Sequence, residues 1–132
     1  MVVVGTSDEW ETEGIDRTTI ALPGEQDELV QRVAAVASCT VVVVNAGGPV
    51  ALPWLDEVDA VVLASFGGEE TGPAVADVLV GAADPGGRLP VTYPVRLEDA
   101  PAWPHYAPVD GVQTYGEGRL FGYRGHDASG VA

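Results

Sequence analysis

Three short runs rich in β-branched residues dominate the hydrophobic pattern of the chain. They span residues 2–5, 40–48 and 60–68, and each closes on glycine. Continuous apolar runs of this length are typical of strands that are covered on both faces, as in parallel sheets. The pattern therefore predicts three parallel strands between layers of helices.

Two stretches with helical periodicity alternate with these runs. Residues 23–37 carry acidic side chains in the first turn, where the helix dipole favours anions. The apolar positions expected to form the buried face of this helix are Leu29, Val30, Val33, Val36 and Ala37. Residues 69–87 repeat the scheme, with Pro73 suited to the first turn and Gly81 to the end of the helix. Both stretches predict surface helices.

Residues 88–94, with the sequence RLPVTYP, predict a fourth strand. Pro90 has no N–H to donate to a sheet ladder, so this strand is expected at a sheet edge or beside a bulge. A short helical turn is also expected between the second and third strands. The resulting order of elements predicts the α/β class, as a three-layer α/β/α sandwich with a mostly parallel sheet.

Periodicity is lost between residues 95 and 118, where prolines alternate with aromatic residues. A stretch of this length without its own pattern is usually a functional loop or a linker. Trp103, His105 and Tyr106 suit the wall of a sugar site, but packing of the loop onto its own domain is favoured by about two to one. Trp54, at the start of the short helical turn, is expected in the core.

The charge balance excludes several classes of partner. The 132 residues carry a formal net charge of −14, with six arginines and no lysine. Such a chain has no basic patch for the phosphates of nucleic acid or anionic lipid. The apolar runs also fall far short of the roughly 20 residues that span a bilayer. One soluble domain is expected, with neither nucleic acid nor membrane as a partner, and its cellular location stays open.

Cysteine and histidine are too scarce for a disulfide or a metal site. Cys39 is the only cysteine and is expected to be a small buried residue. His105 and His126 are isolated along the sequence, and two histidines without a cysteine cluster make a poor zinc site. No metal is expected.

The segment SDEWETEGIDR, residues 7–17, concentrates negative charge in one loop. Its carboxylates are Asp8, Glu9, Glu11, Glu13 and Asp16. A run of acids in a loop is solvated charge in about three cases of four. The chemical alternative is a general acid, because neighbouring carboxylates and closure against an apolar surface both disfavour ionisation. Arg17 opposes that effect and is therefore expected to pair with Asp16.

Two glycine-rich segments, residues 45–50 and 66–70, fit neither the dinucleotide-binding nor the P-loop spacing. Tight turns are their expected role. A flavodoxin-like nucleotide binder is disfavoured for the same reason.

Taken together, several segments resemble the C-terminal α/β-sandwich domain of glycoside hydrolase family 3. They are ETEGIDR, LPGEQDELV, VVVVNAGGPV, PW, GGEETGPAVADVLVG, DPGGRLPVTYP and YGEGRLFGYRGHD. Their order and spacing match the family over nearly the whole chain. The resemblance implies one such domain over residues 1–132, incomplete at both ends, with residues 95–118 as a proline-rich loop within it.

The resemblance implies part of a retaining β-glycosidase, most similar to β-glucosidases, that hydrolyses terminal β-linked sugars. In this family a (β/α)8 barrel precedes the domain and carries an aspartate nucleophile, while the α/β domain supplies the general acid/base glutamate. The glutamate before the Gly-x-Asp-Arg pattern maps onto Glu13, and Glu11 is the fallback. The implied partners are a carbohydrate and the barrel, no cofactor is expected, and the substrate-binding residues are unknown.

The chain departs from the family pattern at two places. Glu69, followed by Glu70, occupies a position where the family usually has glutamine, so no role is carried over from that glutamine. His126 occupies a position where the family more often has tyrosine.

A function of a different class stays open. Without a barrel partner, the chain would be a non-catalytic α/β module that binds a carbohydrate or a protein. A barrel with an aspartate nucleophile, encoded upstream of residue 1, would favour the enzyme.

Overall fold

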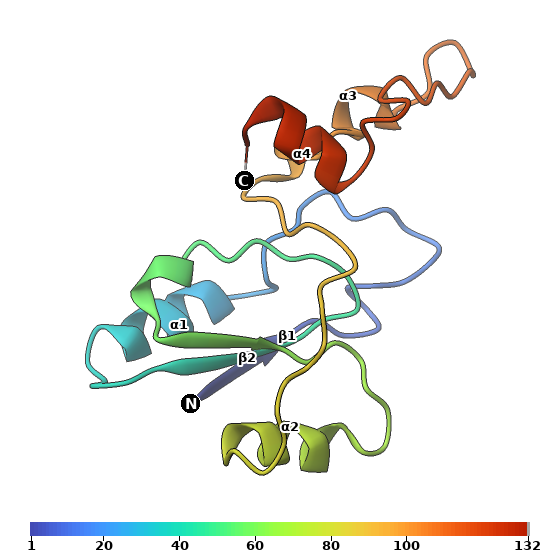
Figure 1. Cartoon of the computed structure of the whole chain (residues 1–132). Coiled ribbons are helices and arrows are strands. Elements are labelled where there is room, and N and C mark those ends of the chain that lie inside the picture. Colours follow the sequence, from blue (N-terminus) through green and yellow to red (C-terminus); the bar gives the residue numbers. More distant parts are fainter. Residues whose placement is uncertain (132) are drawn as a thin grey trace.

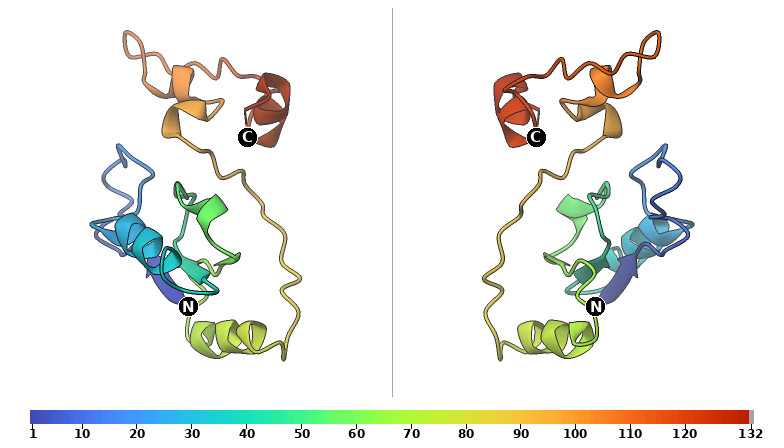
Figure 2. Two further views of the ribbon diagram at one scale, coloured as in Figure 1. Left: turned by 90° about the vertical axis from the view of Figure 1, so that its left-hand side faces the viewer. Right: turned by 90° about the vertical axis from the view of Figure 1, so that its right-hand side faces the viewer.

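The computed structural model describes residues 1–131 and has α/β architecture. Its sheet consists of three parallel strands in sequence order, β1 (Val2–Gly5), β2 (Val41–Asn45) and β3 (Ala60–Leu63). Helix α1 (Gln26–Ala34) and the 3-10 turn η1 (Leu55–Glu57) lie on one side of the sheet, and α2 (Thr71–Leu79) lies on the other (Figures 1 and 2). The predicted α/β class, with a parallel sheet between helices, is confirmed.

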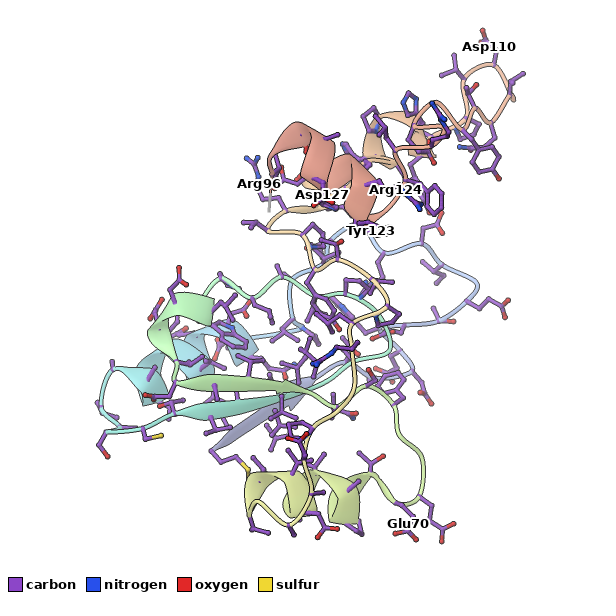
Figure 3. All side chains as sticks on the ribbon, in the orientation of Figure 1. Glu70, Arg96, Asp110, Tyr123, Arg124 and Asp127 are labelled. Atoms are coloured by element: carbon purple, nitrogen blue, oxygen red, sulfur yellow. The ribbon has the colours of Figure 1, made fainter. Side chains whose placement is uncertain are left out.

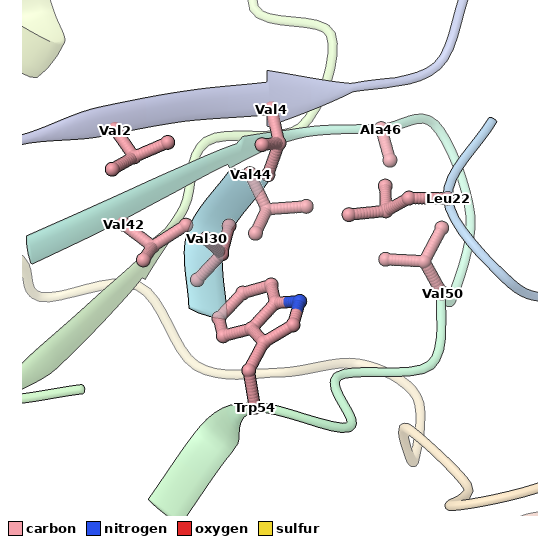
Figure 4. Packing of buried hydrophobic residues seen from close by; sticks show 9 residues of the cluster. All are labelled: Val2, Val4, Leu22, Val30, Val42, Val44, Ala46, Val50 and Trp54. Carbon is pink, nitrogen blue, oxygen red and sulfur yellow. The ribbon is translucent and has the colours of Figure 1, made fainter. Parts of the chain in front are cut away.

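The hydrophobic core fills the space between the sheet and α1. Val30 of α1 and Trp54, just before η1, have no exposed surface, and they pack with the inward-facing valines of β1 and β2 (Figure 4). The indole Nε1–H of Trp54 donates a hydrogen bond of 2.7 Å to Asp27 Oδ1. Trp54 is therefore a core residue, as predicted, and its polar N–H is buried without loss of a partner.

Coverage of the sheet is less complete than the sequence predicted. Only β2 is buried on both faces, whereas Val3 of β1 is 59% exposed and β3 is only half-buried. No residue of α2 is buried, although its first turn holds Pro73 and its end is followed by Gly81 at φ +74°, as predicted. Helix α2 therefore covers its side of the sheet only loosely.

The predicted buried face of the first helix is only partly correct. Val30 is buried and Val33 is half-buried, but Leu29 and Val36 are exposed. Ala37 is exposed as well. Because α1 ends at Ala34, the last two predicted positions lie beyond its final turn.

The prediction of a fourth strand at residues 88–94 is wrong. This segment runs as an extended trace past the sheet (Figure 1) and forms no ladder with β3. Leu89 and Val91 instead line an apolar groove of about 800 Å³ together with Val62 and Val78. Pro90 and Pro94 both lack the N–H group that a sheet ladder requires, which explains why this segment forms no strand.

Cys39 is exposed, so the prediction of a buried cysteine is wrong. It lies in the turn between the end of α1 and the start of β2, where the chain crosses the surface. Thr40, the next residue, is the one that enters the core region.

Residues 97–131 form a lobe that projects from the sheet, here called the C-terminal lobe (Figures 1 and 2). It contains η2 (Leu97–Asp99), α3 (Trp103–Tyr106) and α4 (Tyr123–Ser129). The loop predicted at residues 95–118 thus includes two short helical segments. Figure 3 shows Asp110 at the tip of this lobe and Glu70 at the opposite end of the molecule. Among residues 1–131, no helix is both long and apolar enough to cross a membrane.

Candidate acid/base site

The acidic loop begins where β1 ends, and the strand end is held in place by α1. The side chain of Gln26 accepts a hydrogen bond from Gly5 N–H at 2.7 Å and donates one to Gly5 O at 2.9 Å. Thr6 N–H continues the ladder by donating to Asn45 O at 3.0 Å. Position 5 is glycine because a Cβ there would overlap the carbonyl of Asn45. The start of the loop is therefore fixed to the sheet.

Glu11 attaches the loop to the segment that follows β2. Its carboxylate accepts hydrogen bonds from the Thr6 hydroxyl and from Gly47 N–H, the latter at 2.9 Å. A Cβ at Gly47 would lie 2.6 Å from Glu11 Oε2, so a side chain at position 47 would push this carboxylate from its place. Glu11 is thus held by two hydrogen bonds to its own domain.

Arg17 makes a second attachment to the same segment. Its Nη2 donates a hydrogen bond of 2.9 Å to Pro49 O. No ion pair forms between Arg17 and Asp16, so the predicted pairing of these residues is wrong. The guanidinium turns toward the loop after β2, while the Asp16 carboxylate lies beside the Tyr106 hydroxyl.

Glu13 lies between these two attachments and is exposed. Within residues 1–131 its carboxylate has no hydrogen bond or ion pair. Together with Asp16 it lines a pocket of about 390 Å³, a size within the range of small-ligand sites. The opposite wall comes from the C-terminal lobe and includes Trp103 and Tyr106. Of the two candidate glutamates, Glu13 is therefore the one whose carboxylate is free to meet a ligand.

The three aromatic residues singled out in the proline-rich loop have different surroundings. Trp103 is 41% exposed and Tyr106 is 55% exposed, and both line the pocket with Glu13. The Asp16 carboxylate beside the hydroxyl, and secondly burial, raise the pKa of Tyr106. His105 lies outside this pocket, with its ring against Gly116, where a Cβ would overlap it.

Tyr93 is a neighbour of the site that the sequence did not reveal. Burial, and secondly the negative charge of Glu11, raise the pKa of its hydroxyl above the ordinary value. The sequence also did not predict the contacts of Glu11 with Gly47 and of Arg17 with Pro49. They join positions 36 and 32 residues apart, and no local pattern encodes such pairs.

The remaining sequence candidates lie elsewhere. Glu69 and Glu70 are exposed before α2, and His126 is buried in α4 with its Nδ1 3.3 Å from Val131 O. No set of three or more His, Cys, Asp or Glu side chains is arranged for a metal ion in the part of the chain that the structure describes.

Comparison with known proteins assigns the chain to a family. The sequence profile of the glycosyl hydrolase family 3 C-terminal domain matches residues 1–123. A probable beta-glucosidase I of Aspergillus terreus is 42% identical over 132 residues, which are 100% of this chain and 16% of that protein. The thermostable beta-glucosidase B of Acetivibrio thermocellus is 42% identical over 131 residues, which are 99% of this chain and 17% of that protein.

Solved structures agree with the sequence match. The beta-glucosidase from Kluyveromyces marxianus, in complex with glucose, superimposes with a TM-score of 0.92 at 41% identity. The match covers 99% of this chain and 16% of that one. The chain thus spans about 16% of the length of these relatives. The sequence match, the shared α/β sandwich and the similarity to several beta-glucosidases lead to one conclusion: this chain belongs to the glycosyl hydrolase family 3 C-terminal domain family.

Proposed function

We propose that this chain is part of a retaining β-glucosidase and supplies its general acid/base, Glu13. The (β/α)8 barrel that carries the aspartate nucleophile belongs to another part of the enzyme. The observation that carries this proposal is the exposed, unpaired carboxylate of Glu13 on a loop fixed at both sides. The names of the relatives point to β-linked glucosides as substrates.

The proposed reaction gives Glu13 two successive tasks. It first protonates the departing glycosidic oxygen while the nucleophile attacks the sugar, and it then removes a proton from the water that hydrolyses the covalent intermediate. In retaining enzymes the two carboxyl groups lie about 5–5.5 Å apart across the bond that is cleaved. An exposed carboxyl beside a pocket suits this role, because it can approach both a leaving group and a nucleophile presented by the barrel.

Glu11 is less suited to the same role. Its carboxylate is already engaged by the Thr6 hydroxyl and by Gly47 N–H. To reach a leaving group, this carboxylate would have to break the contacts that hold it to its own domain. The first task therefore falls to Glu13.

Dependence on the leaving group tests the proposal in the full-length enzyme, meaning the polypeptide that joins these residues to a barrel. A dinitrophenolate leaves without protonation, whereas an alkoxide needs it. Glu13→Ala is therefore expected to lower kcat/KM for an alkyl β-glucoside by about 10²- to 10⁴-fold. The glycosylation rate for the dinitrophenyl glucoside should change little.

Glu9→Ala is the matched control, because Glu9 lies in the same loop, is exposed and has no hydrogen bond within the described residues. It should behave like the wild type with both substrates. Equal losses of Glu13→Ala on the two substrates would contradict the assignment of the acid.

A further inference from the structure

We propose that Glu11 is a positioning residue that holds Glu13 at the reacting bond and does not itself transfer a proton. This inference rests on the proposed role of Glu13. It concerns the hydrogen bonds between Glu11, the Thr6 hydroxyl and Gly47 N–H.

The attachment joins three separate parts of the chain. Thr6 directly follows β1 and Gly47 lies just after β2. Glu11 lies in the loop that joins β1 to α1. The loop turns back on itself before this point, since Glu11 N–H donates to Ser7 O at 2.9 Å. Glu11 therefore anchors the loop to the carboxyl ends of two neighbouring strands, which are rigid elements of the fold.

The carboxylate of Glu11 occupies space that a side chain at position 47 would fill. A Cβ at Gly47 would lie 2.6 Å from Glu11 Oε2 and 2.9 Å from Cε2 of Phe66. The absence of a side chain at position 47 thus creates the space that the carboxylate occupies. Substitution of Gly47 is expected to displace Glu11 even though it leaves both glutamates in the sequence.

The short chain distance couples Glu11 to Glu13. Two residues of chain reach at most about 7 Å, so an anchor at Glu11 restricts where Glu13 can be. On the far side, Arg17 is tied to Pro49, two residues after Gly47. Residues 11–17, which include Glu13, are therefore attached at both ends to residues 47–49. A displacement of about 1 Å at a reacting group can cost on the order of 10²-fold in rate.

Substitution by glutamine distinguishes a glutamate that positions the loop from a glutamate that donates a proton. Thr6 Oγ1–H and Gly47 N–H both donate to the same oxygen of Glu11, Oε1. In Glu11→Gln the amide oxygen at this position can still accept both hydrogen bonds. The anchor should survive, with a loss in kcat/KM for an alkyl β-glucoside below about tenfold. The amide of Glu13→Gln has no acidic proton to transfer, so this variant should lose about 10²- to 10⁴-fold.

Variants that break the anchor should impair only the step that needs the acid. Glu11→Ala and Gly47→Ala are expected to lower kcat/KM for the alkyl glucoside by on the order of 10²-fold and to spare the dinitrophenyl glucoside. Thr6→Val keeps the side-chain volume and removes one hydrogen bond, so its effect should have the same selectivity and a smaller size. The exposed Glu9→Gln serves as the control without effect.

The decisive comparison is a double-mutant cycle in the full-length enzyme. If Glu11 acts through Glu13, adding Glu11→Ala to Glu13→Ala changes kcat/KM for the alkyl glucoside by less than about threefold. A large further loss in the double variant, or equal losses of Glu11→Ala and Thr6→Val on both substrates, overturns the proposal. A Glu11→Gln loss as large as that of Glu13→Gln also overturns it. Failure of the proposed function appears separately, as Glu13→Ala without leaving-group dependence.

Discussion

The indole N–H of Trp54 donates a hydrogen bond of 2.7 Å to the carboxylate of Asp27, and this contact joins the η1 turn to helix α1 on one side of the sheet. Asp27 is the neighbour of Gln26, whose side chain holds both the N–H and the carbonyl of Gly5. The core is thus connected through one helical turn to the strand end from which the acidic loop starts. Substitutions in the core should therefore alter the position of the acidic loop.

Removal of Asp27 should weaken the docking of α1. In Asp27→Ala the fully buried indole N–H loses its acceptor, which costs about 1–3 kcal/mol. Amide hydrogen exchange in residues 26–34 should accelerate by about five- to 150-fold, since 1.4 kcal/mol corresponds to tenfold. Glu28→Ala is the control, because Glu28 forms only an exposed ion pair with Arg32. Equal protection in the two variants would count against the contact.

The charge of Glu11 should be visible in the titration of Tyr93. Because that charge contributes to the raised pKa of Tyr93, Glu11→Gln should lower this pKa toward the ordinary value of about 10. The measurement is the alkaline ultraviolet difference spectrum, with Tyr93→Phe to identify the contribution of this tyrosine. No shift in Glu11→Gln would mean that the two side chains lie further apart than in the structure.

The raised pKa of Tyr93 also has a consequence for stability. Its folded pKa lies above its unfolded pKa, so the neutral phenol contributes stability that is fully present below about pH 10. This contribution is lost as the pH rises through the folded pKa. Tyr93→Phe should therefore show a shallower loss of stability above pH 10 in urea unfolding than the wild type, and an identical slope would contradict the prediction.

The isolated 132-residue chain should associate with itself. Its C-terminal lobe exposes large apolar side chains, among them Leu120, Phe121 and Tyr115, which is 80% exposed. Apolar patches of this kind are typical of surfaces that another domain or subunit covers. Light scattering should report oligomers, and a hydrophobic dye should bind. The double variant Leu120→Asn, Phe121→Asn should bind less dye, whereas a monodisperse wild-type monomer without dye binding would refute the prediction.

The isolated chain should also lack glycosidase activity. It supplies the proposed acid but no barrel nucleophile, and the pocket beside Glu13 is bounded only by this domain. Hydrolysis of an aryl β-glucoside by the purified chain should not exceed that of its Glu13→Ala variant. A clear excess over the variant would show that the nucleophile lies within these residues.

The sequence predicted the sheet and helices better than it predicted their contacts. The valine runs and glycine stops located β1, β2 and β3, because local periodicity and turn residues encode such elements. The sequence also predicted a strand at residues 88–94, at an edge or beside a bulge, but the two prolines of this segment lack the N–H groups that a ladder requires. Cys39 was misplaced because α1 ends earlier than its apolar pattern.

At the proposed site, the sequence identified the acidic loop but not which of its two glutamates is held by hydrogen bonds. Glu11 and Glu13 have the same side chain two positions apart, and only the resemblance to the family distinguished them. The structural difference comes from Gly47, 36 residues away, whose N–H engages Glu11 and leaves Glu13 unpaired. Arg17 likewise bonds a distant carbonyl in preference to its neighbour Asp16. These hydrogen-bond partners depend on which loops the fold of the sheet brings close together.

The most direct test of the account is azide rescue of Glu13→Ala in the full-length enzyme, with the dinitrophenyl β-glucoside as substrate. Without its base, the variant should accumulate the glycosyl-enzyme, because deglycosylation becomes the slow step. Azide is an anion that needs no deprotonation, so it should restore turnover and yield the β-glucosyl azide with retained configuration. No rescue of Glu13→Ala, combined with rescue and β-glucosyl azide from Glu11→Ala, would contradict the assignment and move the acid/base to Glu11.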